Sequence, residues 1–149
     1  MGKNWVFFNY KNNLNIIYKW FPIYICKIDY NKNLLILIQV IHNLPPIFQK
    51  FRGSTNGIEY DNKFWFIVHT QDRLNDDVNY YHYFVIFDKN MKLLGYSNSF
   101  KFENYCVEFC IGMVIDYDNH FVITYSTLDS TTKIAIFSAE YINSLIHYI

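Results

Sequence analysis

The sequence predicts an all-β protein of antiparallel hairpins that ends in a short C-terminal helix. Hydrophobic residues make up 52% of its 149 residues and aromatic residues 21%, which is ample for a packed core. Five stretches share one pattern: an apolar run, a polar tip of Asp, Asn or Lys, and a second apolar run. β-Branched and aromatic residues favour strands, and Asn and Asp tolerate turn dihedral angles, so each stretch is predicted as a β-hairpin. The five are 7–20, 27–40, 57–70, 85–98 and 114–127.

Three further segments complete the predicted chain. HNLPPIFQ (42–49) holds two prolines, which disfavour ladder pairing, so we expect an internal boundary there within one domain of residues 1–149. QDRLNDDVN (71–79) is predicted as a charged, solvated loop. SAEYINSLIHYI (138–149) predicts the helix, because Ser138 can cap it and apolar residues recur along one face.

Several predicted strands are apolar at consecutive positions, which indicates sheets covered on both faces. They include NLLILIQVI, KFWFIVH and HFVITY. The aromatic residues before the hairpin tips recur every 20 to 30 residues, which suits antiparallel blades of two hairpins each. We therefore predict about three blades of a β-propeller. Closed propellers have about four to eight blades, so the domain is expected to be incomplete. It is part of a larger propeller, an open stack completed by a partner chain or by self-association, or alternatively a small sandwich.

Charge and cysteine content exclude several classes of function. Formal net charge is zero, whereas nucleic acids and anionic membranes call for a basic surface. The sequence contains no run of 18 apolar residues, so no membrane-spanning helix is predicted. The N-terminus lacks the pattern of a signal peptide. Three cysteines, an odd number, indicate free buried thiols in a reducing compartment. We expect a cytoplasmic protein, in a host cell if the residue bias toward A/T-rich codons reflects a viral genome.

Arg52 is one of two arginines among 13 basic residues and is followed by a Gly-Ser-Thr turn. A guanidinium fork beside free backbone N–H groups would suit an anion or a sugar. The alternative is a solvated surface turn.

Two histidines lie in apolar, aromatic runs. His69 ends KFWFIVH, where a period of two places it on one face with Trp65 and Ile67 and places Phe64 and its alternate neighbours on the other. Such a histidine faces a sugar or phosphate, or is a core histidine bonded to backbone. His82 in NYYHYFVIF has the same two interpretations. No metal-ligand spacing accompanies them, so no metal site is predicted.

Two carboxylates occur near strand ends. Cys106 and Cys110 flank Glu108 in CVEFC, and in a strand these cysteines would lie about 13 Å apart, too far for one metal or a disulfide. Glu108 is a candidate acceptor for a sugar hydroxyl or for Arg52, or simply an edge-strand carboxylate. Asp129, at the end of HFVITYSTLD, could accept from sugar hydroxyls or cap a turn. No nucleotide-binding, zinc-protease or hydrolase signature is present.

Six short motifs follow one another in an order that resembles a known family. They are KNW (3–5), FRGST (51–55), VH (68–69), YYHYFV (80–85), SNSFKFENYCVEFCIGMV (97–114) and ITYSTLDS (123–130). The order is similar to that in the C-terminal part of five-bladed β-propellers related to glycoside hydrolase family 130, the β-mannoside phosphorylases and hydrolases. It most resembles a divergent branch often joined to glycosyltransferases in bacteria and giant viruses. The resemblance covers most of the chain.

The resemblance implies a phosphate- and sugar-binding channel. In the related phosphorylases, cations and a histidine around the central channel hold phosphate, which is a co-substrate. Carried over by motif, Lys3, Arg52 and His69 would line the channel and Asp129 would meet sugar hydroxyls. His82 and Glu108 stand in family motifs as secondary candidates. No other cofactor is implied.

The sequence also departs from the family pattern. Gly2 replaces a Glu, Tyr83 replaces the Arg of the HRF motif, and Ser126 replaces the Gly before Asp129. The family's catalytic acid lies upstream of KNW and is therefore expected to be missing. Because general acid catalysis typically contributes about 10²–10⁴-fold, the resemblance implies a carbohydrate-binding or carbohydrate-processing propeller that is catalytically incomplete. The alternatives are a non-catalytic interaction or scaffold module associated with a glycosyltransferase, and a sandwich unrelated to sugars.

Overall fold

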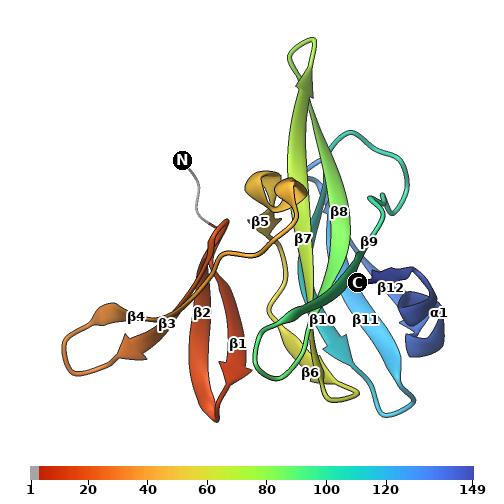
Figure 1. Cartoon of the computed structure of the whole chain (residues 1–149). Coiled ribbons are helices and arrows are strands. Elements are labelled where there is room, and N and C mark those ends of the chain that lie inside the picture. Colours follow the sequence, from red (N-terminus) through yellow and green to blue (C-terminus); the bar gives the residue numbers. More distant parts are fainter. Residues whose placement is uncertain (1–3) are drawn as a thin grey trace.

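The structure, a computed structural model, describes residues 4–149 and confirms an all-β fold of antiparallel sheets with one short α-helix (Figure 1). The N-terminal sheet contains, in order, β1 (Val6–Tyr10), β2 (Asn13–Trp20), β3 (Ile23–Asp29) and β4 (Leu34–Ile41). The central sheet contains β13 (Ile146–Tyr148), β9 (Leu93–Ser97), β8 (Asp77–Phe87), β7 (Lys63–Leu74) and β5 (Arg52–Gly53), with β6 (Ile58–Tyr60) paired to β7. The C-terminal sheet contains β10 (Glu108–Ile115), β11 (His120–Thr127) and β12 (Thr131–Ser138).

All five predicted hairpins form, as β1–β2, β3–β4, β6–β7, β8–β9 and β10–β11. Among the described residues, three hairpins have two-residue turns in which both residues adopt positive φ, the geometry of the turns that match strand twist. The turn pairs are Lys11 and Asn12, Asp61 and Asn62, and Asn75 and Asp76. Asn and Asp tolerate this conformation without glycine, which explains why polar tips were a reliable signal.

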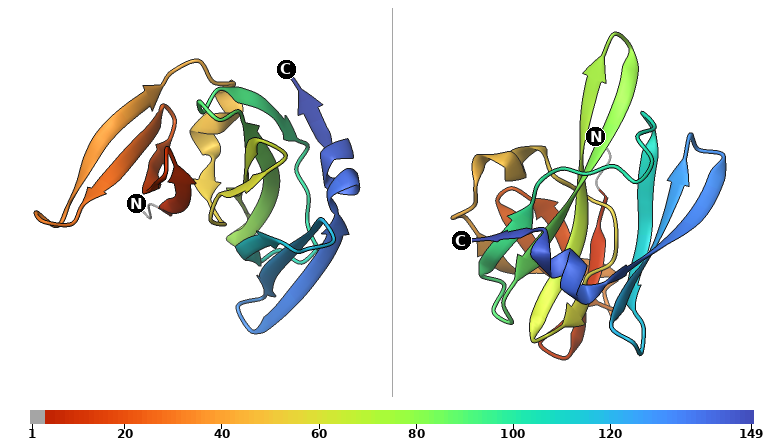
Figure 2. Two further views of the ribbon diagram at one scale, coloured as in Figure 1. Left: turned by 90° about the horizontal axis from the view of Figure 1, so that it is seen from below. Right: turned by 90° about the vertical axis from the view of Figure 1, so that its right-hand side faces the viewer.

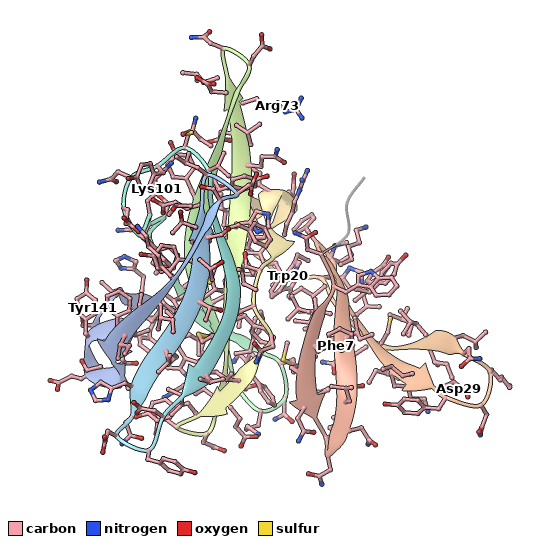
Figure 3. The ribbon with its side chains drawn as sticks, turned by 180° about the vertical axis from the view of Figure 1, so that it is seen from behind. Phe7, Trp20, Asp29, Arg73, Lys101 and Tyr141 are labelled. Atoms are coloured by element: carbon pink, nitrogen blue, oxygen red, sulfur yellow. The ribbon has the colours of Figure 1, made fainter. Side chains whose placement is uncertain are left out.

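The prediction of a loop over residues 71–79 is wrong. β7 and β8 remain paired as far as Leu74 and Asp77, so this charged stretch is the end of a long hairpin. The hairpin projects beyond the rest of the molecule (Figure 1), with Arg73 near its tip (Figure 3). The charged side chains of this segment indicated that it is surrounded by water. A projecting hairpin is surrounded by water just as a loop is, so charge alone did not distinguish the two.

The central sheet lies between the other two sheets and has an apolar core on each face. Phe64, Phe66 and Val68 belong to the cluster shared with the N-terminal sheet, whereas Trp65 and Ile67 belong to the cluster shared with the C-terminal sheet. This confirms the predicted division of KFWFIVH between two faces. Seen from below, the sheets fan out as an arc, with the β3–β4 hairpin reaching away from the body (Figure 2).

Two glycines allow the N-terminal sheet to approach the central sheet closely. A Cβ atom at Gly53 would lie 2.1 Å from Val6 Cγ2 and 2.6 Å from the carbonyl oxygen of Asn4. A Cβ atom at Gly57 would lie 2.3 Å from Phe66 Cε1 of the central sheet and 2.7 Å from Phe8 Cβ of the N-terminal sheet. Distances this short are excluded by van der Waals repulsion, so the glycines of FRGSTNG are required for the packing of the two sheets.

The predicted C-terminal helix is shorter than the sequence pattern indicated. α1 (Ala139–Ser144) begins after Ser138, whose side chain accepts a hydrogen bond from the Tyr141 amide at 3.1 Å, as expected of a cap. The helix pattern fails beyond Leu145, because Ile146–Tyr148 pairs with the open edge of β9 as β13. In the segment 42–49, residues 42–45 form no regular element and Pro46–Lys50 forms a 3₁₀ helix, η1.

Within residues 4–149, each terminal sheet has one face against which no other sheet packs. In the N-terminal sheet, the register places Phe7, Ile16, Cys26 and Leu37 in one row across that face. The outer two of these residues are exposed, whereas Ile16 and Cys26 are buried. In the C-terminal sheet, Val114, Val122 and Ile136 form the corresponding row. The expectation that NLLILIQVI lies in a sheet covered on both faces is wrong for the single chain, because β4 is an edge strand with large side chains exposed.

Candidate functional site

The central sheet brings three of the candidate residues into one row. Arg52 of β5 pairs in register with His69 of β7, and His69 pairs in register with His82 of β8. Residues directly opposite each other in antiparallel strands point to the same face. That face is the one that carries Trp65 and Ile67 and packs against the C-terminal sheet. Residues 52, 69 and 82 are distant in the sequence and meet only through this pairing.

His69 is the buried centre of the row. It is 1% exposed, and Ser54 Oγ lies 2.7 Å from its Nδ1. Its ring also makes edge-to-face contacts with Tyr80 and Phe109, at centroid distances of 5.5 and 5.2 Å. Burial lowers the pKa of His69 to about 4, and the neighbouring His82 and Arg52 act in the same direction. His69 is therefore a neutral hydrogen-bonding group at physiological pH.

His82 is a core histidine bonded to backbone, one of the two interpretations that the sequence allowed. It is fully buried, and its Nε2 accepts a hydrogen bond from the Cys110 amide at 3.2 Å. This bond joins the central sheet to the C-terminal sheet. Among residues 4–149, no group is placed to form a hydrogen bond with its Nδ1. Burial lowers the pKa of His82 to about 4; the Phe100 backbone opposes this shift and Lys101 adds to it.

Arg52 is exposed, and its Nη1 donates to Gln71 Oε1 at 2.8 Å. The expectation of free amides beside it is wrong. The amides of Ser54 and Thr55 both donate to the carbonyl oxygen of Ile67, at 3.1 and 3.2 Å. Thr55 Oγ1 in turn accepts from the Ile67 amide. The turn is therefore bonded to β7, and a ligand here would meet the guanidinium but none of these amides.

Glu108 is buried, and its carboxylate is bonded to backbone amides rather than to Arg52. Its carboxylate accepts three backbone hydrogen bonds, from Phe102 at 2.6 Å, Glu103 at 2.8 Å and Tyr105 at 2.9 Å. All three donors lie in the connection between β9 and β10. Glu108 is thus an anchor for this loop, a role that neither interpretation of the sequence included.

Asp129 is exposed in the turn between β11 and β12, with φ of 53°. Within residues 4–149, no hydrogen bond or ion pair connects it to Arg52, His69 or His82. Lys3 lies outside the described residues. Of the four residues predicted to bind phosphate or sugar (Lys3, Arg52, His69 and Asp129), the structure brings together Arg52 and His69.

The arrangement suits binding better than catalysis. Ser54 and His69 have the spacing of a nucleophile and its base, but a ring with a pKa of about 4 is a weak base. In the part of the chain that the structure describes, no carboxylate forms a hydrogen bond or ion pair with this ring. Across residues 4–149, no group of three or more His, Cys, Asp or Glu residues is placed to hold a metal ion. Sequence analysis included Ser54 only as part of the turn beside Arg52 and did not expect its contact with His69. Gln71 was missed; it could have been found, because it lies two positions beyond His69 on the same strand face.

The three cysteines are free, as expected, but only two are buried. Cys26 and Cys110 lie in the interior, whereas Cys106 is exposed. Cys106 precedes β10 and lies in the loop held by Glu108, so strand geometry does not apply to it. Burial raises the pKa of the Cys110 thiol strongly, which makes it inert at neutral pH.

Comparison with known proteins links the chain to no family: no protein-family model matches it, and no curated protein matches it. In the part of the chain that the structure describes, no helix has the length and apolar character needed to cross a membrane.

Proposed function

We propose that this chain is a non-catalytic interaction module: an open stack of propeller-like blades whose terminal sheets are covered by other sheets when it acts. The observation that carries the proposal is the uncovered apolar face at each end of the stack. Soluble monomers rarely leave contiguous apolar patches of more than a few hundred Å² in contact with water, and such patches mark interaction sites.

The uncovered face of the C-terminal sheet is aliphatic. Its most exposed large side chains are between 50% and 64% exposed. They are Ile111, Val114, Ile134 and Ile136. Val122 and Thr124 of the central strand β11 lie between them in register. β-Branched residues on neighbouring strands make a flat surface that suits packing against another sheet.

The uncovered face of the N-terminal sheet is rich in aromatic residues. Trp5, Phe7, Leu14 and Leu37 are between 45% and 50% exposed. A hollow on this face is lined by Tyr18, Tyr24, Cys26, Leu35 and Leu37. The neighbouring strand β4 has an unpaired edge, which adds backbone groups that another chain could pair with.

Replacing both Ile134 and Ile136 with threonine tests the proposal. Threonine keeps the β-branched shape that suits a strand, and both positions are exposed, so the free energy of unfolding should change by no more than about 1 kcal/mol. Binding of the apolar dye ANS at submicromolar protein concentration should fall severalfold. The control is Leu74→Thr on the projecting hairpin, which should leave dye binding unchanged. Weak dye binding by the wild type, or a loss of stability typical of a core residue, would contradict the proposal.

A second candidate function is the binding of a sugar or an oxyanion beside Arg52 and His69. The alignment of these residues with Ser54 and Gln71 supports it, as does the resemblance to propellers related to glycoside hydrolase family 130. In this proposal the chain is the C-terminal part of such a propeller, binds a mannoside-like glycan or inorganic phosphate, and lacks the acid needed for turnover. The same resemblance points to a glycosyltransferase as an associated chain. We further propose the cytoplasm as the location of the chain, in a host cell if the chain is viral.

Thermal unfolding with inorganic phosphate and a panel of mannosides tests this second function. A ligand at a hundredfold excess over its dissociation constant stabilises the native state by about 2.7 kcal/mol. We expect the wild type and Arg73→Ala to show this stabilisation and Arg52→Ala to lose it, because Arg73 lies on the projecting hairpin away from His69. Equal stabilisation of both variants, or no stabilisation of the wild type, would argue against the site.

A further inference from the structure

We infer that a second copy of this chain covers the two apolar faces, with the N-terminal sheet of each copy packed on the C-terminal sheet of the other to close a dimer of six stacked sheets. This inference rests on the proposed interaction module and names its partner. We call the uncovered side of the N-terminal sheet the aromatic face (Trp5, Phe7, Leu14 and Leu37) and that of the C-terminal sheet the aliphatic face (Ile111, Val114, Ile134 and Ile136).

The two faces are complementary in chemistry. The aromatic face presents rings, and the aliphatic face presents rows of β-branched side chains. Aromatic and β-branched residues are favourable neighbours in sheets. The joint between the central and C-terminal sheets uses such a pair, because Trp65 belongs to one cluster with Met113 and Ile123. The joint between the N-terminal and central sheets joins two rings, with Phe8 edge-on against Phe66 at a centroid distance of 5.4 Å. Both ends of the stack therefore expose the kind of surface that the chain buries at its own joints.

Complementary faces at opposite ends favour contact between the aromatic face of one copy and the aliphatic face of another. Such a head-to-tail contact grows into a filament unless it closes. Because the three sheets fan out as an arc (Figure 2), a second copy that continues the arc brings its own free face back toward the first copy. The second contact repeats the first under two-fold symmetry, which closes the assembly at two copies.

The exposed apolar area is large enough for a stable dimer if the two copies make two contacts, but it is too small if they make one. An aromatic side chain offers roughly 150–250 Å² and a large aliphatic one roughly half as much. The eight side chains of the two faces are each about half exposed, so one copy offers roughly 500 Å² of apolar area and two copies about 1,000 Å². A standard interface buries about 1,200–2,000 Å², of which some 60% is apolar. The closed dimer reaches that range, whereas a single contact reaches about half of it.

Sedimentation velocity of the full chain from about 1 to 100 µM tests the inference. We expect a concentration-dependent species of twice the 18.0 kDa chain mass. Ile134→Lys on the aliphatic face and Phe7→Lys on the aromatic face should each raise the dissociation constant at least tenfold, because each variant loses both contacts of its own dimer. Leu74→Lys, at a side chain that is 69% exposed outside both faces, should behave as the wild type does.

Mixing the two interface variants gives the decisive result. In a dimer of one Ile134→Lys chain and one Phe7→Lys chain, one of the two contacts contains neither substitution, so we expect the mixture to associate more tightly than either variant alone. No gain on mixing, or a mass that grows beyond two copies, would overturn the closed head-to-tail dimer. A wild type that stays monomeric yet binds ANS would overturn the second copy as the partner and leave the interaction module standing. A monomer that binds no dye would overturn both.

Discussion

Replacing Glu108 with alanine should destabilise the protein more than any other single carboxylate substitution we consider. The change leaves the amides of Phe102, Glu103 and Tyr105 without their acceptor. An unsatisfied buried donor costs about 1–3 kcal/mol, and hydrogen bonds to a charged group lie at the upper end. Part of the loop is exposed and water will recover some of the loss, so we expect the free energy of unfolding to fall by about 3–5 kcal/mol.

Urea unfolding of Glu108→Ala beside Glu59→Ala measures this effect. Glu59 is exposed and forms a surface ion pair with Lys89, so its loss should cost about 1 kcal/mol or less. Glu108→Gln should lie between the two, because the amide keeps one acceptor oxygen but turns its NH₂ group toward backbone donors. Similar values for Glu108→Ala and Glu59→Ala would show that the loop does not depend on this carboxylate.

Hydrogen exchange can assign the loss to the loop. In the wild type, the amides of Phe102, Glu103 and Tyr105 should exchange slowly, because each is bonded to Glu108. In Glu108→Gln they should exchange faster, while amides in the paired centre of β7 and β8 keep their protection. Uniform loss of protection would instead indicate global unfolding.

Stability should fall as the pH drops from about 6.5 to about 4, because two buried histidines must stay neutral in the fold. The pKa of each ring, His69 and His82, is lowered from 6.5 to about 4. Between these values the unfolded chain binds more protons than the native chain, so acidification favours unfolding. At about 1.36 kcal/mol per pKa unit, each ring costs roughly 3 kcal/mol once the pH reaches 4. Above pH 6.5 both states are neutral at these rings and the effect is absent.

Carboxylates contribute in a lower range of pH. The pKa of Glu103 is lowered by Lys133 and Tyr125, and that of Asp116 by the His120 and Asp118 amides. A lowered carboxylate pKa adds stability that is lost only as the pH falls below the ordinary values of 4.5 and 3.8. The interval from pH 6.5 to 4.5 therefore reports the histidines.

Urea unfolding at several pH values, together with NMR titration of the ring protons, measures this dependence. His82→Phe keeps an aromatic ring beside Phe100 but cannot titrate, so the slope of stability against pH between 6.5 and 4.5 should fall by about half. The stability at pH 7.5 will also fall, because the Cys110 amide loses its acceptor, and for this reason the slope is the informative quantity. Ring protons of His69 and His82 that titrate near pH 6.5 would contradict the prediction.

Much of the fold was predictable because its signals are local. Asn and Asp at the tips favour positive φ over two consecutive residues, and the flanking apolar residues favour strands, so each hairpin could be located without knowledge of the rest. The same local signals failed where a distant segment decided the outcome. The pattern after Leu145 reads as helix, yet the open edge of β9 pairs with Ile146–Tyr148. Residues 71–79 read as loop, yet β7 and β8 continue their pairing through them.

The candidate site depended more on tertiary structure. Period two placed His69 with Trp65 and Ile67, but the register that sets Arg52 and His82 on either side of it joins segments from three parts of the chain. The sequence offered Glu108 as an acceptor for a sugar hydroxyl or Arg52, or as an edge-strand carboxylate, but its donors come from a loop whose path the sequence does not indicate.

By itself, the sequence determined the all-β class, the hairpins and the two-sided apolar character of the central strands, since these follow from turn preferences and alternation within a few residues. Only the tertiary structure decided which polar groups meet, which backbone amides are already bonded, and which apolar faces remain open. Those properties depend on strand register and on the order in which sheets stack, and both are set by contacts between residues far apart in the chain.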